Sequence, residues 1–170
     1  TRKNFNSFDL NIPNFLTNGL KQAFDAARAG KDSPLLDSMF KGINIVGAGF
    51  GPVGTTLNGV AQTGALELRN NSTLRSNLAN GNYAALAGQL SQLNYNTFPG
   101  SGNESLPAVP SGVNGAVLRL NGFPENFILT NPQFGCSVGC TPAGAATLLT
   151  NGAHSNYHSM QALATFRNLS

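Results

Sequence analysis

The sequence predicts an α+β protein, with several short amphipathic helices in its N-terminal half and antiparallel strands and long irregular loops in its C-terminal half. Apolar residues recur at helical spacing within residues 17–93. Apolar and polar residues alternate with a period of two in residues 155–166. The 170 residues fit one domain, with a mainly helical part with an N-terminal strand (1–93), a Gly/Pro/Ser-rich loop (94–116) and a strand-rich part (117–170).

Two short helices are expected near the N-terminus. The first spans residues 17–29, carries an apolar stripe and ends at Gly30. The second has Ser33 as its N-cap, Pro34 at its first helical position and Gly42 as its stop. We expect these two amphipathic helices to pack together.

Residues 42–64 are too rich in glycine for a regular element to be expected. Gly47, Gly49 and Gly51 invite comparison with a nucleotide-binding loop. The dinucleotide fingerprint requires a helix to begin directly after the glycines, and no helical pattern begins for about ten residues. The Gly-Lys-Ser/Thr of a P-loop is also absent. A flexible surface loop is therefore the favoured interpretation.

Residues 65–93 are again predicted to be helical, with a break at Asn80-Gly81 and a last helix that Asn82 can cap. Arg69 and Arg75 in this stretch are interpreted as parts of solvated helix faces. Residues 94–116 show no periodicity and are expected to form a loop.

From Val117 onward, three runs are predicted to be extended: "AVLRL", "ENFILTN" and "SNYHSMQALATF". The last run contains His158, four residues after His154. On a strand this spacing separates the two Cα atoms by about 13 Å, which is too far for both side chains to bind one metal ion. No metal site and no cofactor are therefore expected.

Cys136 and Cys140 lie in "CSVGC", where three intervening residues including a glycine can curl into a small loop. A local disulfide is favoured; a metal site and free thiols are the alternatives. Two cysteines alone make a poor zinc site, since distant ligands would have to complete it.

The composition is low in charge, with 10% charged residues against about 25% in an ordinary globular protein. The net charge of +3 comes from ten scattered basic residues that form no stripe, so nucleic-acid binding is not expected. The seven acidic residues are dispersed, and no serine lies in a G-x-S-x-G turn. No catalytic residues are assigned, and we expect a protein that is not an enzyme. No apolar run approaches the length of a membrane-spanning helix.

Four stretches carry a resemblance in their order along the chain: "LNIPNFLTNGLKQAFDAARAG", "ALELRNNSTLRSNLANGNYAALAGQL", "GFPENFILTNPQFG" and "NGAHSNYHSMQALATFR". They resemble one region of the Oar-like TonB-dependent outer-membrane receptors, which begin with a carboxypeptidase-regulatory-like domain. The resemblance implies an extracellular excursion with small helices between two barrel strands. The TonB box and plug of such receptors have no counterpart in this chain, and its few strands cannot close a barrel or span a membrane alone.

Two functions follow as expectations. The first is a non-catalytic extracellular structural protein that assembles with other copies of itself through strand pairing, into a filament. The alternative is a surface segment of an outer-membrane transporter, where it joins the rest of the barrel and takes part in ligand recognition. Both place the chain outside the cell or at the outer-membrane surface of a Gram-negative bacterium. The strands expected to be unpaired in the chain and to mediate assembly are residues 4–12 and 155–168, with the side chains Phe5, Phe8, Leu10, Ile12, Tyr157, His158, Met160, Ala162, Leu163, Ala164 and Phe166.

Overall fold

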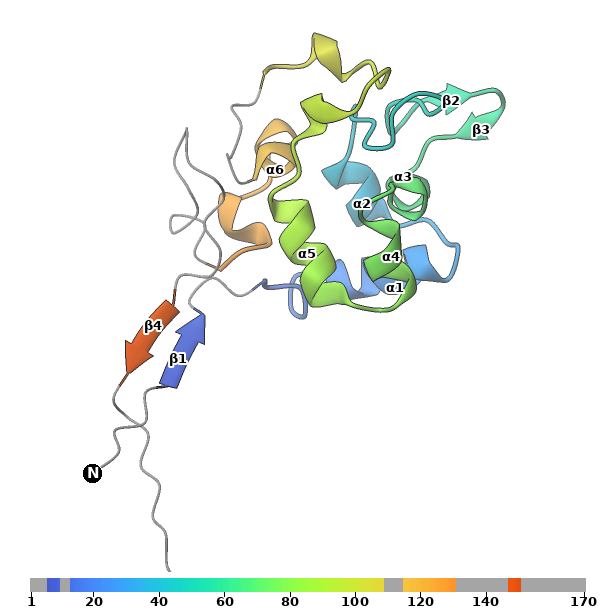
Figure 1. Ribbon diagram of the computed structural model, residues 1–170. Helices are drawn as coiled ribbons and strands as arrows, with labels where there is room; N and C mark the ends of the chain where they lie inside the picture. The colour runs from blue at the N-terminus through green and yellow to red at the C-terminus, as the bar shows by residue number, and fades with distance from the viewer. Residues whose placement is uncertain (1–5, 10–12, 109–114, 131–146, 151–170) are drawn as a thin grey trace, which may run out of the picture.

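The computed structural model describes residues 6–9, 13–108, 115–130 and 147–150. Within these ranges the chain forms six α-helices, three short 3-10 helices and two small antiparallel sheets of two strands each. The fold is therefore α+β with helices dominating, in agreement with the predicted class. Figure 1 shows a helical body and, outside it, a ribbon made of β1 (Asn6–Asp9) and β4 (Thr147–Thr150).

The first two helices lie where the sequence predicts them. Helix α1 is Leu20–Arg28, and its buried face includes Leu20, Phe24 and Ala27, which are all fully buried. Helix α2 is Pro34–Met39, with proline in its first turn, where the missing N–H costs no hydrogen bond. The two helices pack against each other, as expected.

Residues 42–64 contain more order than the sequence analysis predicts. Strands β2 (Thr56–Leu57) and β3 (Val60–Ala61) pair as a hairpin. The two turn residues are Asn58 and Gly59, with φ of 49° and 79°. Asn-Gly with both φ positive is the signature of the tight turn that matches strand twist. The prediction of a stretch without regular structure is wrong here, because the Asn58-Gly59 turn brings the residues on either side of it into a hairpin.

The next three helices confirm the helical prediction for residues 65–93. They are α3 (Gly64–Asn70), α4 (Arg75–Ala79) and α5 (Tyr83–Ser91). The break between α4 and α5 falls at Asn80-Gly81, as predicted, and Gly81 has a φ of 70° that suits glycine.

The loop at 94–108 is irregular but anchored to the body. It carries two single-turn 3-10 helices, η1 (Tyr95–Thr97) and η2 (Asn103–Ser105). The Tyr95 ring is buried, and its hydroxyl donates to the Pro107 carbonyl at 2.9 Å. An aromatic side chain with a satisfied hydroxyl therefore fixes a segment that has no periodicity.

The run "AVLRL", predicted as a strand, is instead helix α6 (Ala116–Leu120). In "ENFILTN", also predicted as a strand, residues Glu125–Phe127 form the 3-10 helix η3. Short apolar runs do not distinguish a buried helix from a strand by periodicity. Helix α6 packs against α5 and buries three consecutive residues, Ala116 to Leu118. These residues are therefore buried by helix packing and not by pairing with another strand.

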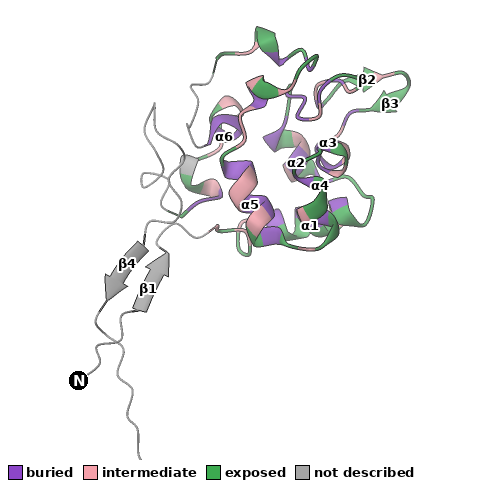
Figure 2. Ribbon diagram, viewed as in Figure 1, coloured by how far each residue is buried: buried purple, intermediate pink, exposed green. Residues whose placement is uncertain are grey.

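Buried apolar side chains of the body form one cluster, which extends from Leu20 in α1 to Ile128 after η3. Figure 2 shows buried stretches of the ribbon, in purple, in α2, α5 and α6. Between α1 and α5, the rings of Phe24 and Tyr83 pack with their centroids 5.4 Å apart. Because all six helices contribute to this cluster, the helices, individually too short to be stable, support one another.

Candidate functional site

Strand β1 pairs with β4 of the same chain in antiparallel register, with Ser7 opposite Leu149 and Phe8 opposite Leu148. The prediction that the strand at residues 4–12 is unpaired in the chain is therefore wrong for its described part. The partner strand β4 is Thr-Leu-Leu-Thr directly before an Asn-Gly pair, which is a strand signal in the sequence. Of the predicted assembly side chains, only Phe8 belongs to a described residue.

The remaining predicted site residues lie outside the described residues. They are Phe5, Leu10, Ile12, Cys136, Cys140, His154, Tyr157, His158, Met160, Ala162, Leu163, Ala164 and Phe166. The disulfide and the second assembly strand therefore stay predictions. Among the described residues, no group of three or more His, Cys, Asp or Glu side chains is arranged to hold a metal ion.

The two ends of the helical body lie side by side. Pro13 forms an isolated antiparallel bridge with Leu129. The Asn14 N–H donates to the Ile128 carbonyl, and the Asn18 amide donates to the Phe127 carbonyl at 2.6 Å. The chain therefore enters and leaves the body at one place.

The glycine-rich segment after α2 is held from inside by the buried side chain of Asn44. Its Oδ1 accepts from the N–H groups of Val46 and Gly47, both at 2.9 Å. Its amide nitrogen donates to the carbonyls of Gly47 at 2.9 Å and Phe50 at 2.7 Å. One amide side chain thus replaces the backbone pairing that this loop lacks. The prediction of a flexible surface loop is wrong for this segment.

Two further buried asparagines extend this arrangement. Asn103 in η2 accepts from the Asn44 N–H at 3.0 Å and donates to the carbonyls of Asn44 and Tyr95. Asn71 donates to the Ile45 carbonyl and accepts from the Leu74 N–H at 2.9 Å. The asparagine frame, by which we mean Asn44, Asn71 and Asn103, therefore connects the glycine-rich segment, the start of α4 and the loop after α5.

Glu67 of α3 is the buried carboxyl group beside this frame. Its Oε2 accepts from the Ile45 N–H at 2.9 Å, whereas Oε1 has no hydrogen-bond partner. Burial raises the pKa of Glu67 to about 7, against the opposing effect of the backbone N–H groups of Ile45 and Val46. A proton on this carboxyl group therefore stabilises the folded chain.

We expect the free energy of unfolding to fall by roughly 2 to 3 kcal/mol as the pH rises from about 5 to about 8. The pKa of Glu67 is higher in the folded chain than in the unfolded chain, so below pH 7 the folded chain holds a proton that the unfolded chain has largely lost. This proton stabilises the folded state, and the stabilisation disappears as the pH rises above 7. Glu67→Gln removes the ionisation and should flatten this fall in urea unfolding at several pH values. Glu104→Gln, which removes an exposed carboxylate, should keep it. An unchanged pH dependence in Glu67→Gln would contradict the role of the buried carboxyl group.

The glycines at 47, 49 and 51 form no phosphate-binding loop. The next helix, α3, begins only at Gly64, after the β2–β3 hairpin. The N–H of Gly47 is already bound to Asn44, and that of Gly51 to the Gln62 side chain at 3.2 Å. Two of the donors that would face a phosphate are thus occupied within the protein, which supports the rejection of a nucleotide site.

No family model, curated protein or solved structure matches the chain. Each of the helices in the described ranges is too short or too polar to cross a membrane.

Proposed function

We propose that the chain is a non-catalytic surface module, carried between two neighbouring antiparallel strands of a receptor-like protein at the outer surface of a Gram-negative bacterium. The observation that supports this most is the closed path of the chain. The body begins and ends at the Pro13–Leu129 bridge, and β1 and β4 pair in antiparallel register beyond it. The resemblance to the excursion of TonB-dependent receptors supports the same arrangement.

The ribbon of β1 and β4 is expected to pair with further strands. A two-stranded antiparallel ribbon is at best marginally stable alone in water, and needs additional strands or a packed face. Within the described part of the chain, neither outer edge of the ribbon is paired with another strand. In the proposed arrangement, neighbouring strands of the receptor, the rest of its barrel, cover these edges and anchor the module.

Assembly with other copies of the chain, into a filament, is the second proposal. The same unpaired outer edges favour it, because exposed edges pair readily with strands of other chains. The two proposals differ in what covers the ribbon: strands of one receptor, or strands of another copy.

Light scattering over a wide range of concentrations, with electron microscopy of the same samples, distinguishes the two proposals. A receptor module is expected to form no regular filaments, because the edges of its ribbon are matched to strands of the receptor and not to those of a second copy. Growth of the scattered mass with concentration, together with visible filaments, would contradict the receptor module and support self-assembly.

A further inference from the structure

Three arginine side chains from three helices line one open depression of about 460 Å³ on the helical body. Arg28 comes from the last turn of α1, Arg69 from α3 and Arg75 from the start of α4. Leu78 and Ala79 of α4 contribute apolar surface, and Ser76 contributes a hydroxyl group. The volume is within the usual range of about 300 to 1,000 Å³ for small-molecule sites.

Two of the three guanidinium groups are fixed by backbone carbonyls. Arg28 Nε donates to the Ala79 carbonyl at 3.0 Å, which ties the end of α1 to the end of α4. Arg69 donates to the Ala27 carbonyl at 3.1 Å and makes a longer contact with that of Lys31 at 3.5 Å. Each guanidinium carries five N–H donors, so these contacts orient the groups and leave donors free for a ligand.

The side chains that line the depression carry an excess of positive charge. None of its lining residues is acidic. Asp25, one turn before Arg28, is engaged by the Lys21 ammonium at 2.8 Å and by the Tyr83 hydroxyl at 2.6 Å. The hydrogen bond from Lys21 and that from Tyr83, with a smaller contribution from the charges of Lys21 and Arg28, hold the pKa of Asp25 below its usual range.

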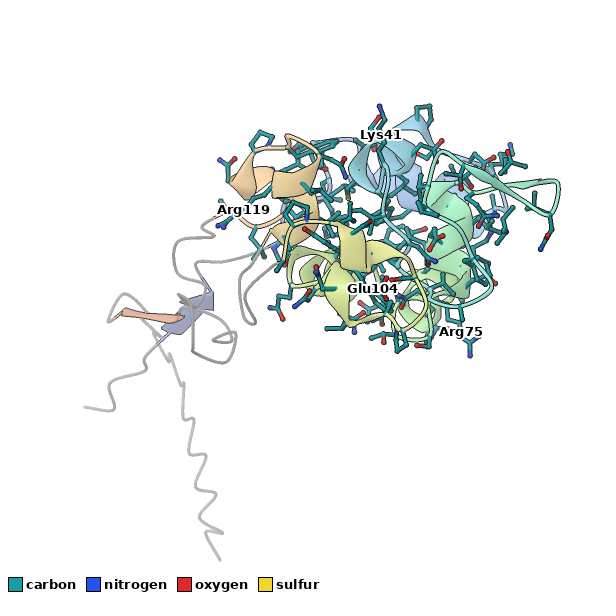
Figure 3. All side chains as sticks on the ribbon, turned by 90° about the horizontal axis from the view of Figure 1, so that it is seen from above. Lys41, Arg75, Glu104 and Arg119 are labelled. Atoms are coloured by element: carbon teal, nitrogen blue, oxygen red, sulfur yellow. The ribbon has the colours of Figure 1, made fainter. Side chains whose placement is uncertain are left out.

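Arg75 is exposed, and its side chain has no hydrogen bond or ion pair to a described residue. Figure 3 shows it at the rim of the body, directed away from it, on the opposite side from Lys41. An arginine of this kind can fold over a ligand that the two fixed guanidinium groups hold.

We propose that this depression binds a small molecule bearing a multiply charged tetrahedral oxyanion, a phosphate or a sulfate group. Two fixed guanidinium groups, with a third that can fold over the ligand, offer donors to a group whose oxygens point in several directions. A single planar carboxylate offers two oxygens and suits one fork. The exposed side chain of Ala79 would contact the remainder of the molecule. This inference goes beyond the proposed surface module and does not depend on strand pairing, because every residue that it uses belongs to the helical body.

The test is a calorimetric titration of the full chain with pyrophosphate, inorganic sulfate and citrate at constant ionic strength. Saturable binding of pyrophosphate or sulfate is expected, and Arg75→Ala should weaken it at least tenfold. Lys41→Ala removes the same charge on the other side of the body and should change the affinity less than twofold. Arg69→Lys keeps the charge but loses the fork, and should weaken binding while its amide spectrum shows the native fold.

Pyrophosphate binding and sulfate binding both support the site, and their relative affinity assigns the phosphate or sulfate source. The inference is overturned if neither anion binds saturably, or if Lys41→Ala weakens binding as much as Arg75→Ala. Tighter binding of citrate than of both other anions would overturn the assignment to a tetrahedral oxyanion.

Discussion

Gly64→Ala should reduce the free energy of unfolding by about 3 kcal/mol or more. Gly64 is the first residue of α3, at the point where this helix crosses α2. A Cβ atom there would lie 2.4 Å from both the carbonyl carbon and the carbonyl oxygen of Leu36. Backbone atoms cannot move aside as a flexible side chain can, so α2 and α3 would have to separate. Urea unfolding followed by circular dichroism measures the loss.

Gly88→Ala is the matched control, because it makes the same chemical change inside another helix. In α5, a Cβ at this position would meet only Pro13, at an ordinary 3.9 Å. Alanine is the better helix former, so the variant should gain about 0.5 to 1 kcal/mol. Equal effects of the two substitutions would contradict the close approach of α2 and α3.

Asn44→Ala should cost about 3 kcal/mol, because four backbone groups, two of them in buried and two in part-buried hydrogen bonds, lose their partner together. These groups are the N–H groups of Val46 and Gly47 and the carbonyls of Gly47 and Phe50. Asn44→Asp keeps the shape but replaces the two donors with a buried negative charge, and it should be comparably destabilising. The same urea unfolding experiment measures both variants.

Asn70→Ala provides the control for Asn44. The Asn70 side chain is exposed and makes one hydrogen bond, to the Leu66 carbonyl at 2.8 Å. Its removal should change stability by no more than about 0.5 kcal/mol. If Asn44→Ala is as mild as Asn70→Ala, water replaces the lost amide and the asparagine frame does not hold the glycine-rich segment.

Local sequence signals predicted most of the helical half. The buried stripe of α1, the proline that begins α2 and the break at Asn80-Gly81 each depend on a few neighbouring residues, and all three predictions are confirmed. Side-chain spacing and backbone preference act within one or two turns, so a single sequence contains this information.

The failures have a different physical origin. Five apolar residues such as "AVLRL" can be buried as a strand or as a helix, and the choice depends on the distant α5 surface against which α6 packs. The pairing of β1 with β4 joins segments about 140 residues apart, which no local pattern encodes.

The asparagine frame is also long-range: Asn44 and Asn103 bind each other across 59 positions. Only the position of Asn44 between two isoleucines hinted that this amide would be buried. The arginine depression has the same long-range origin. From the sequence, Arg69 and Arg75 are interpreted as parts of solvated helix faces, and only the packing of α1 places Arg28 beside them.

The central claim is that β1 and β4 of one chain pair with each other and close the path around the helical body. Disulfide cross-linking of Ser7→Cys with Leu149→Cys tests it, in a chain in which Cys136→Ser and Cys140→Ser remove the native thiols. The two positions are directly opposite in the ribbon. Opposite residues in antiparallel strands have Cα atoms about 4.5 to 5.5 Å apart, within reach of a disulfide. Ser7→Cys with Leu148→Cys is the control, because a shift of one residue places the two thiols on opposite faces.

Chains labelled with ¹⁵N and unlabelled chains are unfolded, mixed, refolded together and oxidised, and the linked peptides are weighed by mass spectrometry. We predict efficient linkage in the opposite pair, with both linked peptides either labelled or unlabelled, and little linkage in the control. Linked peptides that combine a labelled and an unlabelled strand would show that β1 and β4 pair between chains, and would contradict the closed path.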